Sequence, residues 1–314
     1  MDKKIKNLVN WFQKERNINF DGFSHLKVKK YEGMGYGVCY TGEEKEYRYG
    51  GYGGSILLWI PYRLLLSREN IGEKTNFLQQ LNFDADKVRN SFRNSYENLH
   101  KKSLDVDLKE HEMDEALLTM FLVYCRNNRE EENYWKPYTD FVCDLPAQGE
   151  FQYMSNDYFS TILPTIKEIY KEAKKELKEK MPNPNEDDSE YRLLYSIVKT
   201  RASKFVDPNS GIIGNTYMIP FFDFFNHKQR DIHDENQEGE EKRVNSFTIY
   251  YNNYDGKNNA FVSPQPGEVV KLKNGEQVFI YYGEELKHYG INEAEEREIE
   301  QQELQAQIQV PSKK

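Results

Sequence analysis

The chain has 314 residues, of which 38% are hydrophobic, 14% aromatic and 30% charged, and its formal net charge is -9. This length allows one large or two small domains, with tyrosine and phenylalanine supplying much of the core. The negative charge argues against nucleic acid as the main partner, because phosphate binding needs clustered cations, and it would attract a basic peptide instead.

The cysteine pattern argues against disulfides and against a zinc site. Cys39, Cys125 and Cys143 are odd in number and far apart, which is typical of reduced thiols in a cytoplasmic or nuclear protein. No Cys-x-x-Cys pair is present, and His111-Glu112 lacks the second histidine of a zinc-binding helix. We therefore expect no metal. The start of the chain has no apolar signal region, and no stretch approaches a membrane span, so we expect a soluble protein.

The first part of the chain predicts one helix and then strands. A helix over about residues 3–16 is predicted by apolar residues at helical spacing, namely Ile5, Leu8, Val9 and Phe12. From Phe23 the pattern turns to strands. Glycines at positions 33, 35 and 37 would let the backbone approach a ligand closely, but no helix pattern follows, as a dinucleotide-binding loop would require. A buried strand within residues 55–67 should stop at Pro61.

The middle of the chain, about residues 68–210, is predicted to be helical. Two apolar faces recur at helical spacing, one formed by Ala116, Leu117, Met120, Phe121 and Tyr124 and the other by Ile166, Ile169, Tyr170, Ala173 and Leu177. Arg201 stands near the end of a further helix, where a cation either complements the helix dipole or binds a ligand. Strands should resume over 246–251 and 268–272, and the chain beyond Gly290 is nearly all polar.

Two later segments each end an apolar run in polar groups. In residues 217–227, four phenylalanines indicate burial, yet Asp223, Asn226 and His227 must find partners there or bind a ligand. Residues 275–283 begin at a Gly-Glu turn, continue as a buried strand and stop at a glycine. Tyr282 is then either an ordinary strand-end aromatic or a phenol presented to a cleft.

Together, and in this order, the two segments resemble the C-terminal half of the SET fold, in the class of the plant Rubisco lysine methyltransferase and the actin-histidine methyltransferase. That class has an aliphatic-Pro-x-x-Asp-x-x-Asn-His motif and then Gly-x-x-Val-Phe-Ile-x-Tyr-Gly, and this sequence matches both. The resemblance extends to Glu-Gly-x-Gly from Glu32, to Ile-Pro and Leu-Leu-Leu-Ser within 57–67, and to Trp-Lys-Pro-Tyr at 135–138.

The resemblance implies an α+β protein, with a SET fold of short strands and small sheets interrupted by a helical insert. We expect an N-terminal helix in 1–22, the first SET part in 23–70, the insert in 71–210, the second SET part in 211–290 and a polar tail in 291–314. The class continues into a sizeable helical substrate-binding domain. Only the short tail stands there in this chain, so most of that domain is expected to be absent.

The cofactor implied by the resemblance is S-adenosyl-L-methionine. Arg201 would pair with the cofactor carboxylate, since a guanidinium offers two parallel charge-assisted bonds. Asn226 would accept from the cofactor ammonium, and the backbone of His227 would meet the adenine. The other positions implied to bind the cofactor are Glu32, Gly33, Met34 and Asp223.

Tyr282 is implied as the catalytic residue. A phenol with a pKa of about 10 is neutral near pH 7, so we expect it to orient the methyl group and the attacking nitrogen rather than to act as a base. The candidate walls of the substrate channel are Phe222, Ser203, Tyr281 and Tyr289, although the aromatic ones could equally be core residues. In the actin-histidine enzyme an Asn and a Trp stand at the positions of Ser203 and Phe222.

The expected function is methyl transfer to a protein lysine, with histidine as the less favoured target. The partner would be a protein substrate or a protein assembly. The alternative that the sequence leaves open is a SET-like structural subunit of a larger protein assembly, with little or no catalytic activity.

Overall fold

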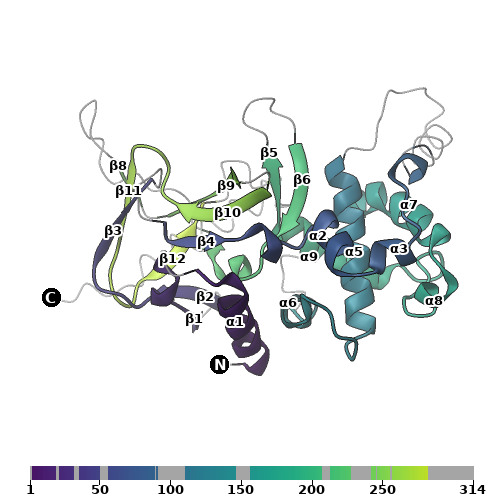
Figure 1. The fold of residues 1–314 in the computed structure, drawn as a ribbon, viewed down its shortest axis with the longest axis horizontal. Coiled ribbons are helices and arrows are strands. Elements are labelled where there is room, and N and C mark those ends of the chain that lie inside the picture. Colours follow the sequence, from purple (N-terminus) through teal and green to yellow (C-terminus); the bar gives the residue numbers. More distant parts are fainter. Residues whose placement is uncertain are drawn as a thin grey trace. The chain divides into compact units, whose positions relative to one another are not determined.

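The computed structural model of the chain describes residues 2–18, 21–31, 35–49, 56–88, 90, 110–145, 156–206, 213–227, 242–244, 246–254 and 257–281. These residues form two compact units (Figure 1). The first unit contains the described residues of 1–74, 133–141 and 203–282, and the second those of 75–132 and 142–202. The first carries nearly all the strands and the second is mainly helical, so the expected α+β class is confirmed.

The first unit begins with the predicted helix, α1 (Lys3–Arg16). Its N-terminus is capped by the side chain of Asp2, which accepts a hydrogen bond from the backbone N–H of Lys4 at 2.9 Å. Ile5, Leu8 and Phe12 are buried, as their helical spacing predicts. The helix ends at Asn17, which adopts the left-handed conformation common at helix C-termini.

A four-stranded sheet brings together strands from the beginning and from the end of the first unit's sequence. Its order is β1 (Leu26–Tyr31), β2 (Gly35–Tyr40), β12 (Gln277–Ile280) and β7 (Asn226–His227). The first two neighbouring pairs are antiparallel, and β12 runs parallel to β7. The sheet therefore joins the glycine-rich hairpin to both aromatic segments of the C-terminal half.

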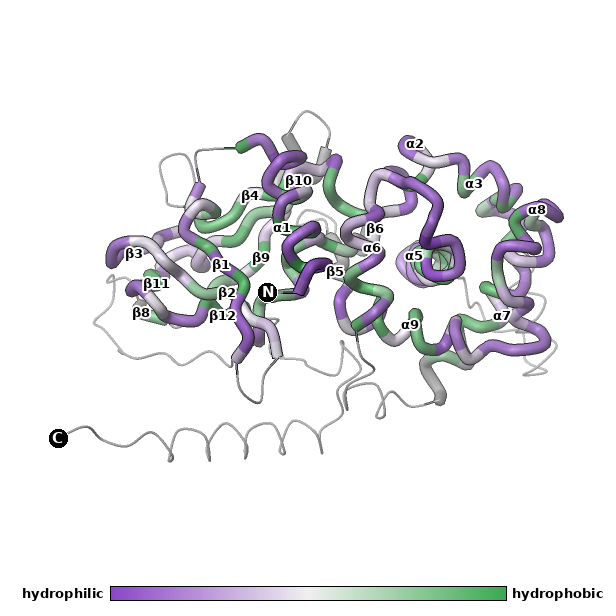
Figure 2. Tube along the Cα trace, turned by 90° about the horizontal axis from the view of Figure 1, so that it is seen from below, coloured by the Kyte–Doolittle hydropathy of each residue, from purple (hydrophilic) through white to green (hydrophobic). Residues whose placement is uncertain are grey.

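Three smaller sheets complete the described strands of the chain. One has the order β4 (Leu58–Ile60), β10 (Lys257–Ser263), β9 (Thr248–Tyr254), and a second the order β3 (Lys45–Arg48), β11 (Glu268–Leu272), β8 (Lys242–Val244). The third pairs β5 (Ala202–Val206) with β6 (Ile213–Met218). The hydrophobic strand β4 stands out in Figure 2 and stops before Pro61, as expected.

Short helices connect the strands of the first unit, and aromatic rings fill its core. The helices are η1 (Gly22–His25), η2 (Tyr62–Leu64), α2 (Arg68–Lys74), α6 (Lys136–Val142) and η4 (Phe222–Phe224). Tyr40 contacts Tyr47 edge to face, and Tyr47 contacts Phe247 in the same way. Trp135, from the Trp-Lys-Pro-Tyr motif, is fully buried, and its indole N–H donates to the carbonyl of Leu64 at 3.2 Å.

The second unit is built around α5 (Glu110–Asn127), with α7 (Asn156–Glu172) and α9 (Ser189–Arg201) packed on it (Figure 1). The shorter helices are α3 (Phe77–Gln80) and α8 (Lys175–Lys178). Both predicted apolar faces are buried except Tyr124, which is partly exposed. The helical run predicted to reach residue 210 ends at Arg201. Ala202 turns extended and β5 begins, because pairing with β6 overrides the local pattern.

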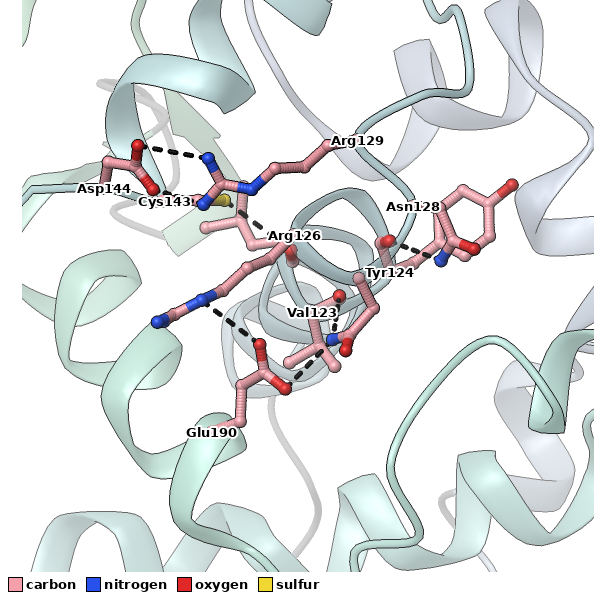
Figure 3. A network of polar contacts seen from close by, with 10 residues as sticks. Val123, Tyr124, Arg126, Asn128, Arg129, Cys143, Asp144 and Glu190 are labelled. Carbon is pink, nitrogen blue, oxygen red and sulfur yellow. Dashed lines mark hydrogen bonds and ion pairs between the residues drawn. The ribbon is translucent and has the colours of Figure 1, made fainter.

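Ion pairs fix the C-terminal end of α5 against its neighbours (Figure 3). Glu190 lies in the first turn of α9, where a carboxylate also complements the helix dipole. One of its oxygens is 3.3 Å from Nε of Arg126, and the other accepts from the Asn127 amide at 2.9 Å. Arg129 pairs with Asp144 just beyond α6. No helix in the described ranges combines the length and hydropathy that crossing a bilayer requires.

Candidate functional site

The two aromatic segments of the C-terminal half meet where β7 lies beside β12. In the register of this parallel pair, Phe279 is opposite Asn226 and Ile280 is opposite His227. Residues far apart in the sequence are thereby held one strand spacing apart. The Asn-His motif and the Val-Phe-Ile strand are therefore neighbours in one sheet.

The carboxyl end of β12 is fixed by Phe247. The backbone N–H of Phe247 donates to the carbonyl of Phe279 at 3.0 Å, and the N–H of Tyr281 donates back to the carbonyl of Phe247 at 2.7 Å. Tyr281 is half-buried directly after this contact. The strand therefore presents its last described residue at a defined position, beside the strand that carries Asn226.

The turn that leads to Asn226 contains a residue in a rare backbone conformation. Phe221 has φ of 76°, in the left-handed region that side chains other than glycine seldom adopt. Such a residue costs about 1–3 kcal/mol and persists only where its surroundings hold it. Its ring is fully enclosed, with centroids 5.2 Å from Phe12, 5.0 Å from Phe23 and 5.5 Å from Phe224. Aromatic packing thus holds the turn in place.

Two of the predicted site residues follow Phe221 in η4. Phe222 is buried, with 4% of its surface exposed, and it lies against the ring of Phe225 at 5.9 Å between centroids. Asp223 is half-buried. Phe222 thus packs like a core residue against Phe225. The sequence had left open whether Phe222 is a core residue or a wall of the substrate channel.

One face of the four-stranded sheet carries polar side chains around Gly37. The strand registers place Tyr31, Cys39, Gln277 and Asn226 on the same face as this glycine. A Cβ atom at Gly37 would lie 2.9 Å from the side-chain nitrogen of Asn226 and 2.9 Å from that of Gln277. Only glycine leaves room for both amides, so the lack of a side chain here serves the site.

Two donors on this face are buried without a hydrogen-bond partner among the described residues: Nδ2 of Asn226 and Nε2 of Gln277. Burial, and then a hydrogen bond with the neighbouring Cys39 thiol, raise the pKa of Tyr31 to about 12. Its hydroxyl therefore keeps its proton at neutral pH. Unpaired buried donors are rare in folded proteins and call for an explanation.

The remaining predicted residues are distributed as follows. Arg201 is the last residue of α9, as expected, and belongs to the second unit, whereas Ser203 lies half-buried in β5 and belongs to the first. The backbone of His227 is in β7. Five predicted residues lie outside the described ranges: Glu32, Gly33, Met34, Tyr282 and Tyr289.

The described part of the chain contains no cluster of three or more His, Cys, Asp or Glu side chains that would hold a metal ion. The described polar groups of the site are the Tyr31 phenol, the Cys39 thiol and the two side-chain amides of Asn226 and Gln277. Amides and a phenol are groups that bind and orient a polar ligand.

Sequence reasoning missed three residues of this site: Tyr31, Gln277 and Phe221. Gln277 stands at a position of the second motif where any residue is allowed. The sign that it belongs to the site was a polar side chain directly before the buried Val-Phe-Ile strand. Tyr31 stands at the end of β1, and the alternating pattern of this strand does not tell which face of the sheet carries the site.

No protein-family model matches this chain, and no curated protein matches it.

Proposed function

We propose that the chain is a protein N-methyltransferase that uses S-adenosyl-L-methionine and acts on a protein lysine, with histidine as the less favoured target. The observation that carries the proposal is the parallel pairing of β7 with β12, which puts the Asn-His motif beside the Val-Phe-Ile strand. The finer fold assignment, a SET fold, is part of the same proposal. It is supported by the small sheets and by the glycine-rich hairpin of β1 and β2, which forms one side of the four-stranded sheet.

The residues on the sheet fit the amino-acid end of this cofactor. The amide nitrogen of Asn226 is buried and has no hydrogen-bond partner among the described residues, and Gly37 leaves room for this amide on the sheet. An amide carries an acceptor as well as donors, so Asn226 suits a group that bears both an ammonium and a carboxylate. The resemblance adds the guanidinium of Arg201 for the carboxylate and the backbone of His227 for the adenine.

The bound cofactor would supply an electrophilic methyl group on a sulfonium. The target nitrogen must arrive without its proton, and a poorly solvated aromatic channel favours that neutral form. Positioning then provides most of the rate, up to about 7–11 kcal/mol in the ideal case. In this scheme Tyr282 orients the methyl group and the nucleophile, while Phe222, Ser203, Tyr281 and Tyr289 line the channel.

A thermal-shift titration with S-adenosylhomocysteine tests the cofactor. At about a hundred times the Kd, linkage stabilises the folded state by about 2.7 kcal/mol. No shift at high ligand concentration would contradict the proposal. The activity is then tested with labelled cofactor on cell-lysate proteins, comparing the wild type with Tyr282→Phe and with Tyr49→Phe, which changes an exposed tyrosine.

Loss of labelling in Tyr282→Phe and not in Tyr49→Phe is the expected result. Cofactor binding without methyl transfer, together with co-purifying subunits, would favour the structural-subunit alternative. A cytoplasmic or nuclear location belongs to the same proposal and is supported by Cys39, Cys125 and Cys143, which are buried thiols rather than disulfides.

A further inference from the structure

The outermost strand of the four-stranded sheet carries a row of lysines. β1 pairs with β2 on one side, and no strand of the described residues pairs with it on the other (Figure 1). Lys27, Lys29 and Lys30 are exposed, and none of them has an ion-pair partner in the part of the chain that the structure describes. This edge of the sheet is therefore basic, although the whole chain has a net charge of -9.

The hydrogen bonds of β2 show which backbone groups of β1 face the open edge. The N–H and the carbonyl of Tyr40 both bond to the turn before β12, at 2.8 Å each, and so point away from its partner Leu26. Bonded and non-bonded pairs alternate along an antiparallel ladder. The N–H and C=O groups of Val28 and Lys30 therefore point to the open edge. No described backbone group pairs with them on that side.

The lysines of β1 limit what can pair with its open edge. On edge strands, lysines commonly prevent two copies of the same strand from pairing. The charge that repels a second β1 attracts a strand of opposite charge. Side chains two residues apart on a strand lie about 7 Å apart on one face, so Lys27 and Lys29 match two carboxylates with one residue between them. Val28, on the other face, is half-buried, and an added strand would cover the rest of its side chain.

We infer that β1 binds an acidic, extended segment of a partner protein, which adds to the sheet as a further strand. The backbone groups of Val28 and Lys30 bond to this segment, while Lys27 and Lys29 select its carboxylates. Nucleic acid carries charge of the same sign, but it has no peptide groups to pair with the open edge. The inference goes beyond the proposed function and does not depend on it.

The first experiment measures how the full chain binds a capped peptide of about ten residues, in which glutamate and threonine alternate. Its carboxylates lie on one face of a strand, and threonine favours the extended conformation. The variant Lys27→Glu with Lys29→Glu should bind at least about tenfold more weakly, because like charges repel. The control is Lys3→Glu with Lys6→Glu, which makes the same change in charge at two exposed lysines of α1. Equal weakening in both variants, or no binding to the wild type, overturns the inference.

The same two variants also test whether the preference for charge can be reversed. Lys27→Glu with Lys29→Glu should bind a peptide of alternating lysine and threonine at least about tenfold more tightly than Lys3→Glu with Lys6→Glu does. Such a gain also shows that the variant still folds. If both variants bind the lysine peptide equally, these positions of β1 do not select the charge of the partner, and the inference is overturned.

The second experiment separates strand addition from attraction between charges alone. Two glutamate–threonine peptides carry N-methyl groups on alternate residues, one on the glutamate nitrogens and the other on the threonine nitrogens. Only one of these sets of nitrogens faces β1 in an added strand, so one peptide should bind at least about tenfold more weakly than the other. Equal affinities would show that the lysines attract charge without forming a strand pair, and would overturn the inference.

The third experiment follows the exchange of the amide hydrogens of Val28 and Lys30 by NMR. Both should exchange rapidly in the free chain, and at least about tenfold more slowly when the glutamate–threonine peptide is saturating. Protection already present in the free chain would mean that other residues of the chain cover this edge, and it overturns the inference. A thymidine oligonucleotide that binds as tightly as the peptide, and is weakened equally in Lys27→Glu with Lys29→Glu, also overturns it, because the edge then binds phosphate.

Discussion

The ring of Phe12 in α1 stacks on the ring of Phe221, with 5.2 Å between centroids and 16° between their planes. Phe221 is the left-handed residue at the start of the turn that leads to Asn226. The N-terminal helix therefore packs against this turn. Its Phe12 ring is part of the aromatic packing that keeps a costly backbone conformation in place beside the candidate site.

Replacing Phe12 by alanine should destabilise the protein by about 3–5 kcal/mol, because a fully buried ring is removed and the cavity closes only in part. Urea unfolding followed by circular dichroism measures the change. Gln13→Ala is the control, since this neighbouring residue is exposed and the substitution should cost at most about 0.5 kcal/mol. A similar loss in both variants would contradict the role given to the Phe12 ring.

Asp21 and Arg16 form a buried ion pair, with 1% and 3% of their side chains exposed. Asp21 also accepts from the backbone N–H of Trp59 at 2.6 Å, while Arg16 donates to the carbonyl of Trp59 at 3.1 Å and lies 4.4 Å over the Phe23 ring. Asp21→Asn should cost about 3–5 kcal/mol, because the guanidinium stays buried without its counter-charge.

The cost of Asp21→Asn is measured in a double-mutant cycle with Arg16→Met, where the double variant should lose less than the sum of the two single ones. Glu179→Gln breaks an exposed pair with Lys175, of which 65% and 86% are exposed, and should change stability by about 1 kcal/mol or less. Additive costs at Arg16 and Asp21 would show that the two side chains act independently.

The elements that could be predicted from the sequence are those whose buried side chains recur at a regular spacing along the chain. The helix over 3–16 and the strand over 268–272 have the bounds expected, because spacing along the chain alone decides which side chains are buried. The strand over 257–263 was missed. Its first half reads Lys-Asn-Asn, and it is held by pairing with β9 and β4 rather than by its own pattern.

The site was harder to predict than the fold elements, because it depends on strand register. Asn226 was expected from its motif, but its neighbours Tyr31 and Gln277 are distant in sequence and become neighbours only through β2 and β12. A slip of one residue in either pairing would send these side chains to the opposite face. The left-handed Phe221 was equally unforeseen, because glycine is the residue that signals such a conformation.

Lys199 and Glu115 join α9 to α5 inside the second unit. Nζ of Lys199 is 3.3 Å from Oε1 of Glu115, and the hydroxyl of Tyr195 donates to Oε2 at 3.2 Å. Glu115 is 2% exposed and Lys199 13% exposed. Lys199→Met should therefore cost about 3–5 kcal/mol, because it leaves a buried carboxylate without its cation.

The double variant Glu115→Gln with Lys199→Met should recover part of that loss, since no unpaired charge remains. Urea unfolding measures both variants. Lys175→Met is the control, because this lysine is in an exposed pair on α8 and its loss should cost about 1 kcal/mol or less. If Lys199→Met costs no more than Lys175→Met, the buried pair does not hold the two helices together.

Buried tyrosines should make the protein sensitive to alkali. Burial raises the pKa of Tyr31, Tyr62 and Tyr134 to about 12, and it raises the pKa of Tyr191 further still. An unfolded chain ionises its tyrosines near their ordinary pKa of about 10. The folded state thus keeps protons that the unfolded state has lost. The stability from these groups is complete below about pH 10 and is lost as the pH rises through about 12.

The free energy of unfolding should accordingly fall between about pH 10 and pH 12, and the part of the tyrosinate absorbance that comes from these buried phenols should rise together with unfolding rather than before it. Tyr191→Phe isolates the contribution of one phenol, whose hydroxyl donates to the carbonyl of Pro182 at 2.8 Å. This variant should be less stable at neutral pH, yet its stability should fall less steeply above pH 10. Tyr49→Phe changes an exposed ring and should leave the slope unaltered. Full tyrosine ionisation in a chain that stays folded near pH 10 would contradict the burial of these phenols.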